Sequence, residues 1–115
     1  MKNQKHDLIR RIIAGILLSV SLSCLASGDE RGTIEPGWYV YADGNVFFYL
    51  KPNKKENPSC DGIPDRWGFD TTTPVGKVQF SAFLLAYTSG REIRVRGDGG
   101  CIHGNTDMAN ELYVF

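Results

Sequence analysis

Hydrophobic and polar residues alternate most clearly over two short runs that flank a turn. Residues 38–42 read Trp-Tyr-Val-Tyr-Ala and residues 46–50 read Val-Phe-Phe-Tyr-Leu, with Asp-Gly-Asn between them. β-branched and aromatic residues on both sides of an Asp-Gly dipeptide are typical of a β-hairpin. The preceding residues, 29–36, are charged and turn-rich, which predicts a frayed lead-in that begins a strand near Thr33.

The middle of the chain predicts a single helix. Residues 71–74, Thr-Thr-Thr-Pro, form a helix start, because a threonine oxygen accepts from free backbone N–H groups and proline suits the first helical position. Gly90 is the matching stop. Lys77, Ser81 and Thr88 form one narrow polar stripe, and the rest of the circumference is apolar. Such a helix is expected to be covered on more than one side.

Three further segments complete a mostly β pattern. Arg66 to Asp70 is a candidate short strand, Arg91 to Arg96 alternates charged and apolar residues, and Glu111 to Phe115 is a final strand. Residues 52–64 contain three prolines and two lysines and predict an exposed loop. The order β-β-β-α-β-β is that of the OB-fold, a small Greek-key barrel. The alternative is an open α+β sandwich with one helix on a sheet.

The first 28 residues have the order of a secretory signal peptide. Four basic residues between Lys2 and Arg11 precede an apolar run, and small residues follow that suit cleavage between positions 26 and 28. The apolar run is shorter than the ~20 residues that span a bilayer, so no stable membrane span is expected. A lipoprotein signal, in which Cys24 is acylated, is the alternative. We therefore expect a secreted or periplasmic protein whose OB-like domain covers residues 29–115.

Removal of such a leader changes the charge of the chain. The whole sequence has 13 basic and 13 acidic residues, but four of the basic residues and one of the acidic residues precede residue 29. The remainder has 9 basic and 12 acidic residues and a formal charge near −3. Proteins that bind phosphate backbones usually carry an excess of Lys and Arg. Nucleic acid is therefore not expected as a partner.

Two cysteines, Cys60 and Cys101, remain in the domain, and an exported pair usually joins. We predict a disulfide that closes a loop of about 40 residues and stabilises the fold by roughly 4 kcal/mol on the chain-entropy model. Small domains commonly need such a link. Two metal-ligating thiolates are the alternative, but the close second ligands of a zinc site are lacking. We expect neither a metal nor another cofactor.

The residue pattern does not favour catalysis. The single histidine of the domain, His103, lies in a glycine-rich loop rather than beside an evident nucleophile. The run from Asp61 to Asp65 is similar to calcium-binding repeats, but it occurs once and offers few of the six to eight oxygens that calcium takes. We therefore expect a protein that is not an enzyme.

The aromatic residues of the hairpin indicate a binding surface instead. Successive side chains of a strand point to opposite faces. The residues of one parity are expected to enter the core: Trp38, Val40, Val46, Phe48 and Leu50. The residues of the other parity are expected to form an exposed aromatic patch: Tyr39, Tyr41, Phe47 and Tyr49. Such a patch suits sugar stacking or a subunit contact, unless both faces are covered within the monomer.

The segment Ser81 to Val95, SAFLLAYTSGREIRV, resembles the B subunits of subtilase-cytotoxin-like toxins. In those proteins a helix ends in a tyrosine, small residues and glycine before a strand that alternates with basic residues. The Asp-Thr-Thr-Thr-Pro helix entry at residues 70–74 and the Gly-Gly-Cys at residues 99–101 fit the same pattern. The chain is shorter than that group, and no glycan-contacting motif matches residue by residue.

The resemblance implies an OB-fold, a ring of five B subunits and binding of host-cell glycans. The leading hypothesis is therefore a glycan-binding homo-oligomer with the apolar helix at the subunit interface. The alternative is a periplasmic or outer-membrane structural protein that binds another exported protein, without a glycan or toxin role. An OB-fold that binds single-stranded nucleic acid would use Arg91, Arg94 and Arg96 as a basic edge, but the acidity of the domain opposes it.

Overall fold

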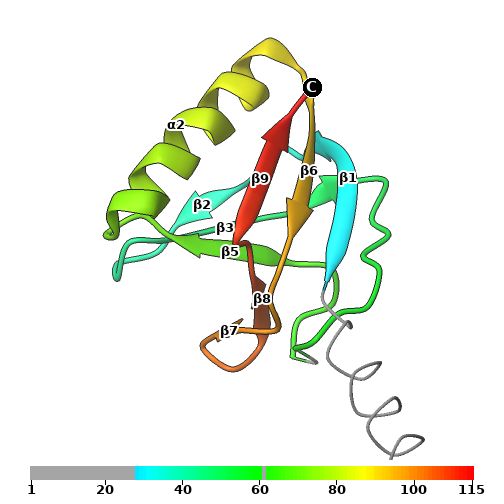
Figure 1. The fold of residues 1–115 in the computed structure, drawn as a ribbon, viewed down its shortest axis with the longest axis vertical. Coiled ribbons are helices and arrows are strands. Elements are labelled where there is room, and N and C mark those ends of the chain that lie inside the picture. The colour runs from blue at the N-terminus through cyan, green and yellow to red at the C-terminus, as the bar shows by residue number, and fades with distance from the viewer. Residues whose placement is uncertain (1–27, 61) are drawn as a thin grey trace, which may run out of the picture.

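The part of the chain that the structure describes, residues 28–60 and 62–115, folds into two β-sheets and one helix (Figure 1). In this computed structural model the prediction of a mostly β domain with one helix is confirmed, although the two sheets are not closed into a barrel. Residues 1–27 of the predicted leader, including Cys24, lie outside the described residues. Gly28 is buried, and its carbonyl accepts a hydrogen bond from Gly97 N at 2.9 Å.

The first sheet has four antiparallel strands in the order β4-β1-β6-β9. Their bounds are Leu50–Lys51 for β4, Asp29–Ile34 for β1, Glu92–Arg96 for β6 and Glu111–Val114 for β9. The predictions for β6 and β9 are confirmed. The prediction of a frayed lead-in is wrong, because β1 is paired on both sides inside this sheet. Buried and exposed residues alternate along β1, but two of the buried positions are Glu30 and Gly32. Hydrophobicity along the sequence therefore does not show this alternation.

The second sheet has five strands in the order β2-β3-β5-β8-β7. Their bounds are Tyr39–Val40 for β2, Asn45–Phe48 for β3, Trp67–Asp70 for β5, Thr106–Met108 for β8 and Cys101–Ile102 for β7. The β2–β3 hairpin and β5 are confirmed. β5 pairs antiparallel with β3 and parallel with β8. β7 and β8 were not predicted, because glycines and polar residues surround these short strands.

The helix α2, Pro74–Ser89, begins and ends where the sequence predicts. Thr73 Oγ1 accepts a hydrogen bond from Gly76 N at 2.9 Å and satisfies one of the free N–H groups of the first turn. Gly90 ends the helix with a φ of 67°, a left-handed conformation that glycine adopts at little cost. Arg91 N then donates to Ala86 O at 3.0 Å and closes the turn.

The core lies where both sheets meet α2. Its buried residues come from all three layers: Ile34, Val46, Phe48, Leu50, Trp67, Phe69, Phe83, Ala86, Ile93, Val95 and Ala109. Trp38 is half-buried and packs edge-on against Phe83, with ring centroids 5.2 Å apart. The predicted inward positions of the hairpin are thus core contacts, with one exception. Val40 was expected in the core but is 54% exposed, because the short strand β2 lies at the edge of its sheet.

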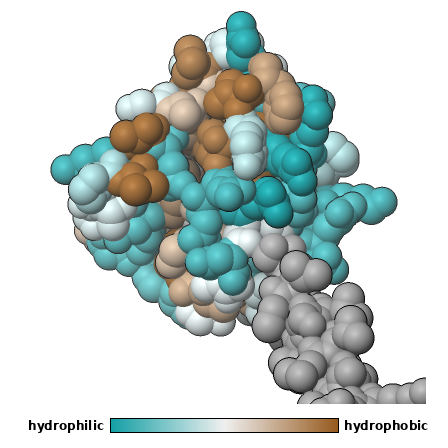
Figure 2. All heavy atoms as spheres, in the orientation of Figure 1, coloured by the Kyte–Doolittle hydropathy of each residue, from teal (hydrophilic) through white to brown (hydrophobic). Residues whose placement is uncertain are grey.

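The helix is covered on one face only, contrary to the expectation from its apolar circumference. Phe83 and Ala86 are fully buried, whereas three large apolar side chains of the helix are exposed: Val75, Val78 and Leu85. Figure 2 shows hydrophobic side chains gathered along α2 and near the end of β9. Within the described residues, the structure contains no helix of the length and apolar character that crossing a membrane requires.

The one-sided packing of α2 predicts unequal costs for two truncations. Phe83→Ala should lower the free energy of unfolding by about 3–5 kcal/mol, because it leaves a cavity among buried aromatic rings. In the monomer, Leu85→Ala, on the exposed face of the same helix, should change it by less than about 0.5 kcal/mol. Urea denaturation of both variants measures the difference. A Leu85→Ala cost as large as that of Phe83→Ala would mean that the outer face is buried in solution.

Candidate functional site

An aromatic cluster lies on the face of the five-stranded sheet that points away from the core. Tyr39 of β2 is the cross-strand partner of Phe47 of β3, and their ring centroids are 5.4 Å apart. Tyr41 lies two residues further along and meets Phe47 edge-on at 5.9 Å. The strand alternation that the sequence predicts therefore brings three of the four expected aromatic residues together.

The cluster has an exposed rim and a buried floor. Tyr39 and Tyr41 are 41% and 53% exposed, as predicted, but Phe47 is only 1% exposed. Phe47 was expected on the surface and instead forms the floor beneath the two tyrosines. Its cross-strand neighbour Gly68 leaves room for it, since a Cβ at that position would lie 2.9 Å from Ile102 Cδ1 and 3.1 Å from Phe47.

Tyr49 does not take part in this cluster. It is half-buried at the break between β3 and β4, where its carbonyl accepts from Glu35 N at 2.9 Å. Among the described residues its ring makes none of the aromatic contacts that join the other three. The predicted four-residue patch is therefore a two-tyrosine surface over a phenylalanine.

His103 completes the rim from a distant part of the sequence. It occupies the β7–β8 turn with a φ of 53°, and its ring centroid is 5.7 Å from Tyr41 and 5.8 Å from Phe47. Its Nε2 lies 2.7 Å from Asp43 Oδ2, in the β2–β3 turn. This contact joins the turns of two hairpins, and we name the exposed group Tyr39, Tyr41 and His103 the aromatic surface.

Asp43 supplies the negative charge at the edge of the aromatic surface. Asn45 N donates to Asp43 Oδ1 at 3.0 Å. This backbone hydrogen bond is the main reason why the pKa of Asp43 lies below its ordinary value, and His103 adds to the effect. The carboxylate is thus ionised at neutral pH and remains accessible beside the rings.

Arg66 contacts both the buried Phe47 ring and the hydroxyl group of Tyr39. Its guanidinium lies over the Phe47 ring, 4.2 Å from the centroid, in a cation–π contact. Nη1 donates to Tyr39 Oη at 2.9 Å, Nε donates to Thr106 Oγ1 at 2.8 Å, and Nη2 donates to Asn105 Oδ1 at 3.1 Å. One buried side chain therefore fixes the hydroxyl end of Tyr39 and the strand that follows the His103 turn.

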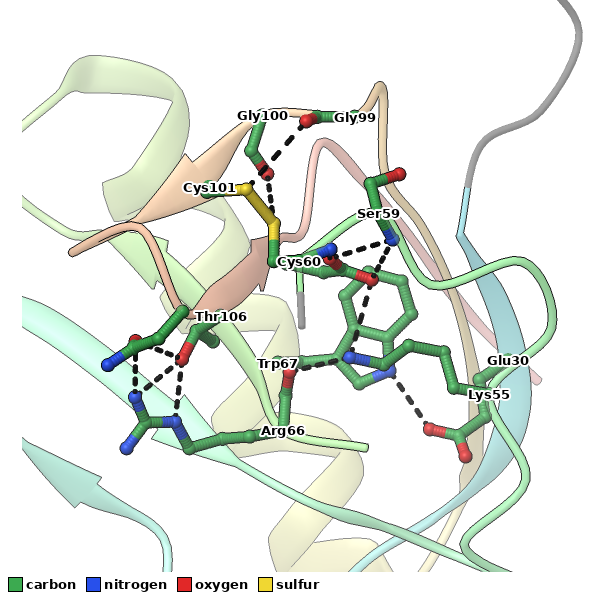
Figure 3. Close-up of polar contacts among 12 residues, drawn as sticks. Glu30, Lys55, Ser59, Cys60, Arg66, Trp67, Gly99, Gly100, Cys101 and Thr106 are labelled. Atoms are coloured by element: carbon green, nitrogen blue, oxygen red, sulfur yellow. Dashed lines mark hydrogen bonds and ion pairs between the residues drawn. A yellow bond between two sulfur atoms is a disulfide. The ribbon is translucent and has the colours of Figure 1, made fainter. Parts of the chain in front are cut away.

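The disulfide predicted from the sequence is present (Figure 3). Cys60 and Cys101 are 41 residues apart in sequence, and their α-carbons are 6.0 Å apart. The bond ties the loop before β5 to β7. Since β7 leads directly into the turn that carries His103, the disulfide restrains one edge of the aromatic surface.

A buried ion pair also holds the loop before β5 against the β7–β8 hairpin. Asp107 Oδ1 accepts from Cys60 N at 2.8 Å, and Asp107 Oδ2 lies 3.5 Å from Lys55 Nζ. Lys55 also donates to the Arg66 carbonyl at 2.6 Å and lies over the Trp67 ring (Figure 3). Most described residues of the loop 52–64 are exposed, as predicted, but only 2% of the Lys55 side chain is accessible. Burial lowers the pKa of Lys55, and Asp107 opposes that shift.

Glu30 of β1 is the third charged residue of this buried group. Its Oε1 accepts from Trp67 Nε1 at 2.9 Å, and its Oε2 accepts from Lys54 N at 2.8 Å. Burial raises the pKa of Glu30, because desolvation outweighs these hydrogen bonds and the nearby charge of Lys55. Glu30 thus links the four-stranded sheet to the centre of the five-stranded sheet through Trp67.

The groups at and near the aromatic surface are rings and hydrogen-bonding side chains. Cys60 and Cys101 are joined and offer no free thiol, and His103 faces a carboxylate rather than a nucleophile. Among residues 28–60 and 62–115 there is no group of three His, Cys, Asp or Glu side chains that could hold a metal ion; Asp61 of the calcium-like run lies outside these ranges.

No family model, curated protein or solved structure matches the chain.

The raised pKa of Glu30 predicts a pH dependence of stability. A carboxyl group whose pKa is higher in the folded state than in the unfolded state stabilises the fold when it is protonated. This stabilisation is fully present below the pKa of the unfolded state, near 4.5, and is lost as the pH rises through the pKa of the folded state. The stability advantage of the wild type over Glu30→Gln should therefore be largest in acid and decrease above about pH 4.5. Urea denaturation across this range measures it. Exposed Glu56→Gln is the control, and equal pH profiles of the two differences would contradict the assignment.

The disulfide predicts a second stability effect. Replacing Cys60 and Cys101 together by serine should lower the free energy of unfolding by roughly 4 kcal/mol, because the unfolded chain regains the freedom that the closed loop removes. Chemical denaturation of the oxidised wild type and the double variant tests this. Unchanged stability would show that the covalent link is dispensable and that the Asp107 contacts alone hold the junction.

Proposed function

We propose that this chain is an exported, non-catalytic module that binds cell-surface glycans through the aromatic surface. The observation that carries the proposal is the exposed pair Tyr39 and Tyr41 above a buried Phe47. The apolar C–H face of a sugar ring packs on an aromatic ring, and its hydroxyls need polar partners at the margin. Asp43 lies at that margin, beside His103.

Rigidity supports a binding role for this surface. Tyr39 is fixed through its hydroxyl by Arg66, and His103 is fixed by Asp43. Groups that are already held in place lose less conformational entropy when a ligand binds, so more of the contact energy appears as affinity. The disulfide and the Asp107 contacts hold the turn that carries His103 in the same way.

Export and the toxin-like assembly are part of the same proposal. The disulfide favours an oxidising compartment, in agreement with the signal peptide expected over residues 1–28. The resemblance of residues 81–95 to subtilase-cytotoxin-like B subunits favours a glycan-binding homo-oligomer. In such an assembly the exposed apolar residues of α2, Val75, Val78 and Leu85, would lie at the subunit contact.

A second candidate function rests on the same exposed face of α2. A periplasmic or outer-membrane interaction protein would use Val75, Val78 and Leu85 to bind another exported protein and would have no glycan or toxin role. The two functions place the ligand on different elements. Substitutions on α2 and in the β2–β3 hairpin therefore separate them.

The glycan proposal predicts that Tyr41→Ala abolishes binding on a glycan array, because it removes the most exposed ring of the aromatic surface. The matched control is Val40→Ala, which truncates the adjacent and equally exposed residue at the end of β2. It should bind like the wild type. Failure of the oxidised wild type to bind any glycan, or equal binding by the wild type and Tyr41→Ala, would refute this function.

A further inference from the structure

A groove lies between the first turns of α2 and the link from β8 to β9. We propose that this groove binds a small primary amine with an apolar body. It consists of two hollows that share Asn110, with volumes of about 270 Å³ and about 90 Å³. Sites for small molecules begin at about 300 Å³, so the groove suits a small molecule rather than a polymer. None of the residues of the aromatic surface lines it, and the proposal does not depend on the glycan function.

The larger hollow suits an apolar body. Apolar side chains from β5, from α2 and from the β8–β9 link line it: Phe69, Val75, Met108 and Ala109. Gly76 brings the first turn of α2 against the end of β5, because a Cβ at this position would overlap the Asp70 carbonyl. The walls of the hollow are therefore held together by close packing of the helix on the sheet.

The polar groups where the two hollows meet are oxygen acceptors. Gln79 Nε2 donates to Asn110 O at 2.9 Å and lies 3.5 Å from Ala109 O, which fixes the orientation of the amide. Gln79 Oε1 has no hydrogen-bond partner among the described residues, and it is not buried. Asn110 Nδ2 donates to Asp98 Oδ2 at 3.0 Å. The nitrogens of both amides thus face protein oxygens, and the atoms left for a ligand accept hydrogen bonds.

Asp98 adds a negative charge to these acceptors. Its two carboxylate oxygens accept from Gly100 N at 2.9 Å and from Asn110 Nδ2, but both donors are neutral. Each carboxylate oxygen can accept a further hydrogen bond. The other two charged residues of the smaller hollow, Arg96 and Glu111, form an ion pair at 3.7 Å. Because Asp98 takes part in no ion pair among the described residues, the smaller hollow has a net negative charge.

The start of α2 sets the orientation of the ligand. A helix N-terminus has a partial positive charge, which opposes a cation beside Thr73. The cationic head therefore belongs near Gln79 and Asp98, and the apolar body belongs near Phe69 and Met108. An ammonium group has three N–H donors and no acceptor, so it complements a group of acceptors with a negative charge. A carboxylate head has neither property.

The test compares two probes that share one apolar body. Isopentylamine has an ammonium head, and isopentyl alcohol has a hydroxyl group in its place. Each is titrated into the oxidised wild-type protein, and binding is followed by NMR through the side-chain amide signals of Gln79 and Asn110. The amine should bind with a dissociation constant in roughly the millimolar range, as expected for so few atoms. The alcohol should bind about three- to fivefold more weakly, because a partly exposed charge contact contributes little more than this.

Charge substitutions test the role of Asp98. Asp98→Asn keeps the shape of the side chain and should reduce the affinity for the amine to that for the alcohol. The matched control is Glu92→Gln, which removes an exposed negative charge at the other end of β6 and should leave both affinities unchanged. An Asp98→Asn variant that keeps the wild-type preference for the amine would overturn the proposal.

Two substitutions on α2 test the place of binding. Val75→Lys puts a longer, cationic side chain at the larger hollow and should weaken binding of the amine severalfold. Val78 is 71% exposed on the same helix but does not line the groove, so Val78→Lys should bind the amine like the wild type. Equal losses in both variants would mean that the amine is not bound in the groove.

The remaining outcomes separate this site from the aromatic surface. Isopentylamine binding that persists in Tyr41→Ala supports the groove, whereas binding lost in Tyr41→Ala would move the amine to the aromatic surface and overturn the proposal. Equal affinities for the two probes, or amide signals of Gln79 and Asn110 that do not move, would also overturn it. Each of these results leaves the glycan function to its own test.

Discussion

The arrangement of the structure depends on the contacts that the buried Asp107 carboxylate makes. It accepts from the backbone of Cys60 and pairs with Lys55, and both partners belong to the loop that precedes β5. A buried charge is stable only when it is paired and hydrogen-bonded. This requirement fixes an otherwise irregular loop against β8, beside the disulfide, just before the chain enters β5.

Strand β5 and the residue before it connect the interior to the surface. Trp67 points into the core and donates to Glu30, while its neighbour Arg66 lies on the opposite face under Phe47 and Tyr39. Because successive side chains of an extended chain alternate, two adjacent residues serve both faces. The buried charges on one face and the aromatic surface on the other are therefore parts of a single arrangement.

The sequence predicts the helices and strands in which apolar residues recur with the period of the element. It does not predict the bounds of strands in which polar or small residues occupy the buried positions. The helix ends at Thr73 and Gly90 follow from local chemistry and are correct. The strand predicted near Thr33 in fact begins at Asp29, and its first residues were taken for a frayed lead-in because charged and small residues occupy its inward positions. The alternation along the hairpin correctly exposes Tyr39 and Tyr41, but it cannot reveal that Arg66 and His103, which the sheet order brings close, cover Phe47.

The position of the covalent bond between Cys60 and Cys101 has a consequence for the maturation of the protein. The bond restrains the strand that leads into the His103 turn, so the geometry of the rim depends on a reaction that occurs only where thiols are oxidised. A newly made chain in a reducing environment lacks that restraint. Under the proposed binding function, full order of the rim would follow only after the two thiols have been oxidised.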